Sequence, residues 1–240
     1  MFPIDSRLMR TVLLQVRWLL LVFASGIVNT GGFLACGRFV SHVTGFATHF
    51  GMHIEEWEWL EAASVFTVPL YFLIGGLFSA WMVDRRIQRG QNPFYALPLL
   101  VVAVLLAAVS IGGYAGWFGV FGGAPDLKED YPALVLLCLA SGIQNAVVTT
   151  ATGTILRSSH LTGATTDLST GVMRSLMMPK GSIERELENR LNWMRASMIF
   201  CFVSGAVAGA CSFARWQYFG FVTPAVIAAG VAIRLAIRHK

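Results

Sequence analysis

Long apolar stretches alternate with short charged segments along the whole chain. Six of these stretches are close to the length of about twenty residues that one helical crossing of a bilayer needs, and they lie at 18–37, 62–83, 96–118, 132–155, 196–214 and 218–237. Charged residues are concentrated between the stretches, whereas a water-soluble protein spreads them along its length. The pattern predicts an all-α membrane protein with six transmembrane helices, in a single membrane domain over residues 1–240.

The composition agrees with this prediction. Hydrophobic residues make up 55% of the chain and charged residues only 13%, about half of the charged share in an ordinary globular protein. A net charge of +5 would suggest a nucleic-acid partner in a soluble chain, but no basic face interleaved with aromatic residues is present. We expect no nucleic acid and no cofactor. The four cysteines show no metal-ligand spacing, so we interpret them as packing residues; they are Cys36, Cys138, Cys201 and Cys211.

The distribution of Lys and Arg predicts the orientation in the membrane. If the N-terminus is cytoplasmic, 15 of the 18 basic residues lie inside, in the N-terminal tail, the 84–90 turn, the 157–195 connection and the C-terminal tail. Only Arg38, Lys128 and Arg215 then lie outside. Because basic residues near a span resist translocation, we expect both termini to be cytoplasmic.

The connection before the fifth span contains a helical pattern of its own. Apolar residues recur at Ile183, Leu187, Leu191 and Met194, opposite a charged face. Ser182 stands at a suitable position to cap this helix. The pattern predicts an amphipathic cytoplasmic helix at about 182–194, and a solvated, charged extension of the fifth span is the open alternative.

Two motifs occur once in each half of the chain. The pattern S-G-I-x-N lies at 25–29 and at 141–145, and S-H-x-T-G lies at 41–45 and at 159–163. Because the offsets are nearly equal, at 116 and 118 residues, we interpret the halves as a duplication, with repeat one at about 12–120 and repeat two at about 131–238. Each copy holds three spans, an odd number, so the second copy must enter the membrane from the opposite side. The sequence therefore predicts an inverted repeat.

The repeated motifs resemble the signature segments of the YoaK family, which are predicted bacterial membrane proteins of unknown function. The similarity is carried by residues 26–34 and 39–45 in the first half and by 142–146, 160–163 and 166–167 in the second. The resemblance implies a multi-span protein of the bacterial inner membrane. It implies no reaction and no substrate.

The segments 38–54 and 157–173 are too polar to cross the membrane freely and too apolar for solvated loops, which is typical of re-entrant hairpins or half-helices. In each, His-x-Thr-Gly sets an imidazole and a hydroxyl beside bare backbone. Transporters with inverted repeats place their substrate site between such segments. We therefore expect a substrate site formed by Asn29, His42, Thr44, Gly45, Asn145, His160, Thr162 and Gly163. The alternatives are Asn residues that only fix helix packing and His residues that cap helices.

Charged and titratable residues near these motifs suggest further roles. Arg38 and Arg157 precede the two histidines and are candidates for binding an anion or positioning the substrate. Asp167 takes the place of His49 in the second copy, and a carboxylate within the membrane is a candidate for proton or cation coupling. Helix capping is the alternative for Asp167, which we expect to be partly buried.

The histidines of the first copy also raise the question of a metal site. His42, His49 and His53 would share a face of one continuous helix and could bind zinc. Glycines interrupt this segment and the second copy retains a single histidine, so we expect no metal site there.

The leading hypothesis is a small-solute transporter. A channel of the same inverted design, or a non-transporting membrane scaffold or sensor, is the alternative. No nucleophile, zinc-protease or nucleotide-binding motif occurs, so an enzyme is not expected, and a membrane metalloenzyme is the last alternative. The expected partners are an unidentified small solute and the lipid bilayer, and a homo-oligomer is left open.

Overall fold

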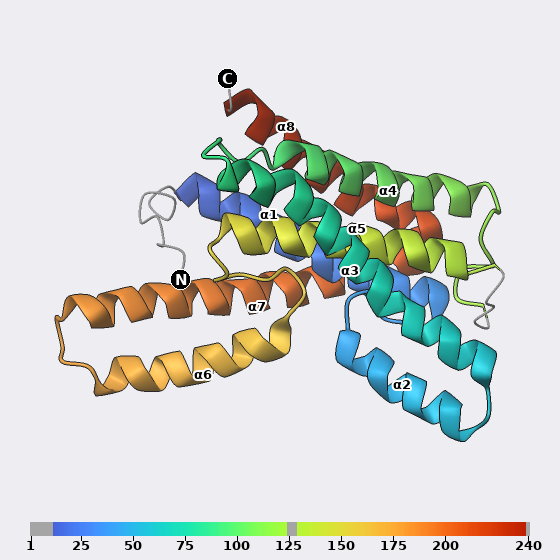
Figure 1. Ribbon diagram of the computed structural model, residues 1–240, viewed down its shortest axis with the longest axis horizontal. Coiled ribbons are helices and arrows are strands. Elements are labelled where there is room, and N and C mark those ends of the chain that lie inside the picture. The colour runs from blue at the N-terminus through green and yellow to red at the C-terminus, as the bar shows by residue number, and fades with distance from the viewer. Residues whose placement is uncertain (1–11, 124–128, 239–240) are drawn as a thin grey trace.

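The computed structural model describes residues 12–123 and 129–238, and within these residues all regular structure is helical (Figure 1). This confirms the all-α class. The N-terminal arginines Arg7 and Arg10, and Lys128, lie outside the described residues. The elements are α1 (Val12–Cys36), α2 (Val43–Glu55), α3 (Trp59–Gln88), α4 (Ala96–Tyr114), α5 (Tyr131–Ala151), α6 (Leu161–Met177), α7 (Ile183–Trp216), the short 3-10 helix η2 (Gln217–Phe221) and α8 (Val222–Arg238).

Five segments of the described chain are long and apolar enough to cross a membrane. The fifth, Ile183–Ile237, has 55 residues and contains α7, η2 and α8. As one straight helix it would be about 80 Å long, more than twice the hydrocarbon thickness of about 30 Å. The chain instead bends at Gln217, where φ is 47°, and α8 runs back along the bundle (Figure 1). The chain is a multi-pass membrane protein.

Residues 182–194 form the first part of α7 rather than a separate helix on the membrane surface. The oxygen Oγ of Ser182 accepts a hydrogen bond from the amide N–H of Arg185 at 3.2 Å, which begins the helix as expected. Helix α6 lies along this extension (Figure 1). A Cβ on Gly171 would stand only 2.1 Å from Oδ1 of Asn192. The extension is therefore packed on one side rather than solvated all round.

Glycines allow α1 and α7 to approach each other at backbone distance. A Cβ on Gly205 would lie 2.0 Å from the carbonyl oxygen of Phe23, and one on Gly26 would lie 2.2 Å from that of Phe202. In lipid, where apolar burial gives little attraction between helices, small residues permit this close packing.

The pair α3 and α5 repeats this arrangement. A Cβ on Gly75 would lie 2.4 Å from the carbonyl oxygen of Leu139, and one on Gly142 would lie 2.0 Å from that of Phe72. The residues of the two pairs correspond in sequence. Leu139 lies 116 residues after Phe23, which is the offset of the first repeated motif. Phe202 lies 130 residues after Phe72, and Gly205 lies the same number after Gly75. Each half thus contributes one helix to each close pair.

Polar contacts give the relative directions of the long helices. Near one end of α1, Sγ of Cys36 donates to the carbonyl oxygen of Asp130 at 3.8 Å. Nearer the other end, Nε2 of Gln144 donates to the carbonyl oxygen of Leu21 at 2.9 Å and to Oγ of Ser25 at 2.6 Å. Residue numbers rise along α1 as they fall along α5, so these two helices are antiparallel.

Helices α3 and α5 run in the same direction. The hydroxyls of Thr67 and Tyr131 are hydrogen-bonded near the start of both helices. Near the end of both, Oγ1 of Thr150 donates to Oδ1 of Asp84 at 3.2 Å. Because α3 begins eight residues before Thr67, its start extends about 12 Å beyond the start of α5.

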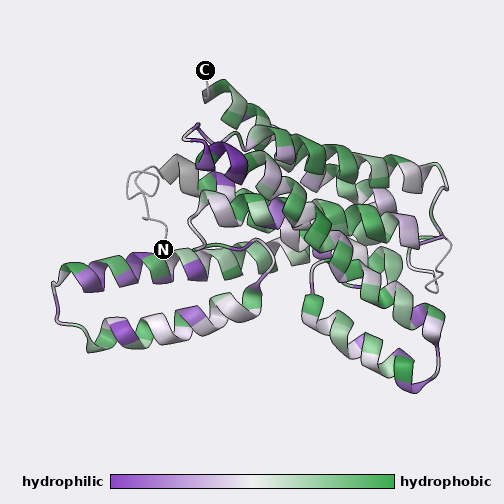
Figure 2. Ribbon diagram, viewed as in Figure 1, coloured by the Kyte–Doolittle hydropathy of each residue, from purple (hydrophilic) through white to green (hydrophobic). Residues whose placement is uncertain are grey.

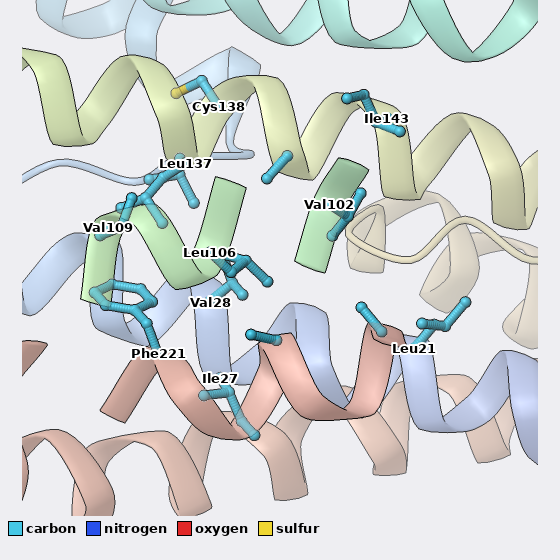
Figure 3. Packing of buried hydrophobic residues seen from close by; sticks show 14 of the residues in the cluster. Leu21, Ile27, Val28, Val102, Leu106, Val109, Leu137, Cys138, Ile143 and Phe221 are labelled. Carbon is cyan, nitrogen blue, oxygen red and sulfur yellow. The ribbon is translucent and has the colours of Figure 1, made fainter. Parts of the chain in front are cut away.

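The centre of the bundle is filled by apolar side chains from α1, α4, α5 and η2 (Figure 3). Leu21, Leu106, Leu137 and Phe221 are fully buried there. Outward-facing apolar residues remain exposed on α3, α4 and α8, as lipid-facing surfaces require. Hydrophilic residues gather instead at the end of α3 and along the first half of α7 (Figure 2).

Candidate functional site

After α1, the chain folds back along the helix that it has just left. Val40 packs over Gly32, where a Cβ would lie only 2.4 Å from Cγ1 of Val40. Oγ of Ser41 then donates a hydrogen bond to Oδ1 of Asn29 at 3.0 Å. Asn29 precedes the end of α1 by seven residues, so α2 begins about 10 Å back from that end.

The chain folds back in the same way after α5. Gly153 and Thr154 have positive φ values of 59° and 69°, which reverse its direction. Oγ of Ser158 then donates to Oδ1 of Asn145 at 3.4 Å. Asn145 precedes the end of α5 by six residues, which places the start of α6 about 9 Å back along α5. Both predicted asparagines therefore bind the segment that leads into a short helix.

The two short helices lie in the segments for which half-helices were expected. Gln144 of α5 contacts Leu21 and Ser25 of α1. These two residues precede Asn29 by eight and four positions along α1, so Asn145, the neighbour of Gln144, lies about that far from the level of Asn29. At 1.5 Å per residue, the two asparagines are about 6–12 Å apart along the bundle. From there α2 ends at the start of α3, and α6 ends near the start of α7, at the opposite end of the bundle (Figure 1).

His42 and His160 occupy equivalent positions at the starts of the two short helices. Each is the N-cap residue, with φ and ψ of −101° and 75° for His42 and of −102° and 70° for His160. Neither side chain makes a capping hydrogen bond, so the imidazoles of His42 and His160 do not cap these helices.

Each imidazole instead folds over the first turn of its helix, above a glycine. A Cβ on Gly45 would lie 3.0 Å from Nδ1 of His42, and one on Gly163 would lie 2.7 Å from Cε1 of His160. Both contacts are closer than side chains normally tolerate. The glycine of S-H-x-T-G therefore leaves room for the ring of the preceding histidine.

A small hollow at the start of α2 brings several predicted residues together. It is lined by Phe33, Gly37, Arg38, Phe39, His42, Gly45, Phe46, His49 and Val65. Its walls are mostly apolar, and one guanidinium and two imidazoles supply polar groups. Thr44 lies on the same turn and is exposed.

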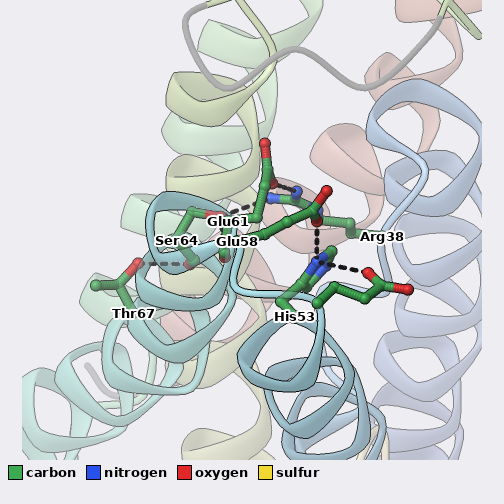
Figure 4. Close-up of polar contacts among 7 residues, drawn as sticks. Arg38, His53, Glu58, Glu61, Ser64 and Thr67 are labelled. Atoms are coloured by element: carbon green, nitrogen blue, oxygen red, sulfur yellow. Dashed lines mark hydrogen bonds and ion pairs between the residues drawn. The ribbon is translucent and has the colours of Figure 1, made fainter.

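Arg38 is neutralised by an acid of α3. Its Nη2 lies 2.7 Å from Oε2 of Glu61, and its Nη1 donates to Oγ of Ser64 at 3.2 Å (Figure 4). Arg157, in the second half, is exposed and donates to Nδ1 of His160 at 3.4 Å. Within residues 12–123 and 129–238, no carboxylate forms an ion pair with Arg157.

Asp167 lies in the seventh position of α6 and is exposed. This corrects the expectation of partial burial, and a residue in the middle of a helix does not act as its cap. Thr162, Thr166 and Thr170 form an exposed row on the same helix, in which each later hydroxyl donates to the carbonyl oxygen four residues earlier, at 3.0 and 3.1 Å. The second copy thus presents a polar, exposed helix.

The single chain holds the two motifs at separate positions. Helix α2 packs on α3, and α6 packs on α7. His49 lines the hollow at α2, whereas its counterpart Asp167 lies on α6. The hollow is therefore built from the first copy alone, which includes Val65 of α3.

One protein family matches both halves of the chain. Residues 18–234 match the model of a family described as a protein of unknown function (DUF1275). The chain belongs to this family. The match agrees with the resemblance of the repeated motifs to the YoaK family. No curated protein and no solved structure matches the chain.

One structural residue of this DUF1275 protein was missed from the sequence. Gln144 is 2% exposed, and its amide joins α5 to α1 through two hydrogen bonds. A buried amide in an apolar span is costly unless it is paired. It occupies the variable position of S-G-I-x-N, where the first copy has Val28. This replacement of an apolar residue by an amide is the feature of the sequence that indicates a buried polar contact at Gln144.

Proposed function

We propose that this DUF1275 protein is a small-solute transporter of the bacterial inner membrane. Its six crossings are α1, α3 and α4 in one repeat and α5, α7 and α8 in the other, with both termini in the cytoplasm. The proposal includes no catalytic role.

The packing of the long helices supports an inverted repeat. Helices α1 and α5, which carry the first motif of each half, are antiparallel. The close pair α1 with α7 has the same glycine geometry as the pair α5 with α3. A two-fold axis in the membrane plane would exchange these two pairs, as expected for inverted repeats.

The observation that carries the proposal is the placement of the two short helices. Each begins beside an asparagine part-way along a long apolar helix, and the two run toward opposite ends of the bundle. With α1 and α5 crossing the bilayer, both N-termini would lie at membrane depth, one on each side of the middle. Free N–H groups and the positive end of the helix dipole there favour polar or anionic groups.

Polar side chains at this depth must meet water or protein rather than lipid. His42, Thr44 and His160 are exposed, and so are Thr162 and Asp167. We propose that they border a water-filled path for the solute, and that a second copy of the chain covers part of it in a homo-oligomer.

Each group in the path has a proposed role. The imidazoles of His42 and His160 and the hydroxyls of Thr44 and Thr162 hydrogen-bond the solute. Gly45 and Gly163 leave room for the rings, while Asn29 and Asn145 position the segments. Arg38 and Arg157 attract or orient an anionic group, and Asp167 and His49 are the candidates for coupling to a proton or a cation.

Uptake by proteoliposomes tests this proposal. A defined mixture of amino acids, sugars, carboxylates and nucleosides is offered to vesicles with and without the protein, and retained solutes are identified by mass spectrometry. For a solute found in this way, His42→Ala and His160→Ala should each lower uptake by about tenfold or more, since each removes a hydrogen bond to the bound solute. Gly51→Ala is the control on α2, because a Cβ there would meet nothing within 4 Å. Parental uptake by both histidine variants would contradict the proposed site.

A channel is the second candidate, favoured by the two short helices that begin at membrane depth and run toward opposite ends of the bundle. Channels also use the positive ends of half-helices to select what passes. A transporter saturates with solute and shows counter-transport, in which solute on one side accelerates exit from the other. Flux that rises linearly with concentration and shows no counter-transport would favour the channel.

A further inference from the structure

The turn between α2 and α3 gathers three side chains of metal-ligating types. They lie one helical turn beyond His49, whose ring is 6.5 Å from that of His53. Nδ1 of His53 lies 2.8 Å from Oε2 of Glu58 and 3.9 Å from Oε2 of Glu56. The ligand atoms of all three residues lie within 4.8 Å of one another. In Figure 4, two carboxylates converge on the ring of His53. We propose that this cluster binds one divalent transition-metal ion of the Zn²⁺ class.

The distances suit such an ion after small side-chain movements. A tetrahedral Zn²⁺ ion with bonds of about 2.0–2.2 Å has ligand atoms about 3.4 Å apart. The two distances from His53 lie on either side of this value. Glu56 and Glu58 have side chains that are 54% and 50% exposed, so they can rotate, whereas that of His53 is only 22% exposed. The imidazole is the more fixed ligand, and water can complete the coordination.

The backbone of the turn already holds the ligands together. The amide N–H of Glu58 donates to the carbonyl oxygen of His53 at 2.9 Å. Trp57, between the two acids, has a φ of 61°, a left-handed conformation that bulky residues rarely adopt. The turn therefore brings two residues that are five positions apart into direct contact.

The chemistry of the donors favours a transition metal over Ca²⁺ or Mg²⁺. Imidazole nitrogen suits Zn²⁺ and similar ions, whereas Ca²⁺ and Mg²⁺ prefer oxygen ligands alone. Arg38, which could compete for the acids, forms an ion pair with Glu61 instead. Glu55 adds a further exposed carboxylate to the neighbourhood.

This cluster differs from the three-histidine face considered from the sequence. His53 takes part, but its partners are the two glutamates of the turn rather than His42, which lines the hollow at the start of α2. The second copy has Gly171 at the position 118 residues after His53. The metal site therefore belongs to the first half alone and does not depend on the proposed transport.

Calorimetric titration with ZnCl₂ tests the proposal on the purified, metal-free full chain in detergent. We expect one saturable site per chain. His53→Ala and Glu58→Gln should each weaken Zn²⁺ binding by about tenfold or more, because even groups that only support a metal ligand are worth that much. The matched control is Glu55→Gln, which removes a neighbouring carboxylate outside the cluster and should change the affinity by less than about twofold. Excess MgCl₂ should not displace the zinc.

Three results would overturn the site. They are the lack of saturable Zn²⁺ binding by the parent, parental affinity in His53→Ala, and a loss in Glu55→Gln equal to that in Glu58→Gln. The last result would mean that zinc is attracted only by diffuse negative charge. Thermal unfolding without zinc establishes that each variant folds, and Glu58→Gln decides the question if His53→Ala does not.

Discussion

Replacing Gly75 by alanine should force α3 away from α5. The added Cβ would lie 2.4 Å from the carbonyl oxygen of Leu139 and 3.0 Å from the amide nitrogen of Ile143. Ordinary contact begins at 3.4 Å, so the backbones must separate locally by 1.0 Å, the difference between 3.4 and 2.4 Å. Both crowded atoms belong to the backbone of α5, and no side-chain rotation can relieve the overlap. Overpacking of this kind costs about 1–3 kcal/mol.

The neighbouring glycine provides a matched control. A Cβ on Gly76 would meet nothing within 4 Å. Both substitutions replace glycine by alanine in the same helix, so they share the gain in helix propensity of up to about 1 kcal/mol. The difference in the free energy of unfolding between the two variants therefore measures the contact between the helices. We expect Gly75→Ala to be less stable than Gly76→Ala by about 1–3 kcal/mol.

The free energy of unfolding can be measured by SDS titration in mixed micelles, followed by circular dichroism. Equal stability of the two variants, within about 0.5 kcal/mol, would show that α3 and α5 do not touch at Gly75. The packing argument for the inverted repeat would then lose one of its two close helix pairs.

Two further predictions concern orientation and coupling. Orientation can be tested by single-cysteine labelling in a background without the four native cysteines, all of which are free thiols. A cysteine replacing Gln88 should resist an impermeant maleimide added to intact cells, while one replacing the exposed Trp57 should react. The reverse pattern would refute cytoplasmic termini. Asp167→Asn should abolish gradient-driven accumulation of the solute but preserve solute exchange, because it removes the charge and nearly keeps the shape. Unchanged accumulation would end the coupling role.

The long helices could be predicted from the sequence because each contains an apolar stretch of about the length of one crossing. Their ends were less predictable, since a helix that leaves the membrane can continue through charged residues. Helix α3 starts at Trp59 and ends at Gln88, beyond the apolar stretch at 62–83. Likewise, the amphipathic pattern at 182–194 does not say whether that helix stops before the next span. The lack of glycine and proline between Ile183 and Cys201 is the signal that it continues as one helix.

The existence and position of the short helices could be predicted from the duplicated motifs, but their side-chain partners could not. Glu61 reaches Arg38 only because α2 and α3 form a hairpin, which brings residues 23 positions apart together. The exposure of Asp167 depends on which side of α6 faces α7, and the polar residues of α6 do not mark that side. The buried positions Ala164, Gly171 and Ser175 mark it, and the last two lie against Asn192 and Asn189 of α7.

The two copies share a backbone plan but differ in charge at the starts of their short helices. Helices α3 and α7 correspond when Gly75 is aligned with Gly205, which is an offset of 130 residues. In this alignment, the second copy has Leu191 at the position where the first copy has Glu61. The acid that neutralises Arg38 therefore has no counterpart beside Arg157. A symmetric inverted repeat would present equivalent sites to both sides of the membrane. For the transport proposed above, the positive charge of Arg157 at the start of α6 favours anionic groups on that side, which gives the two openings different affinities.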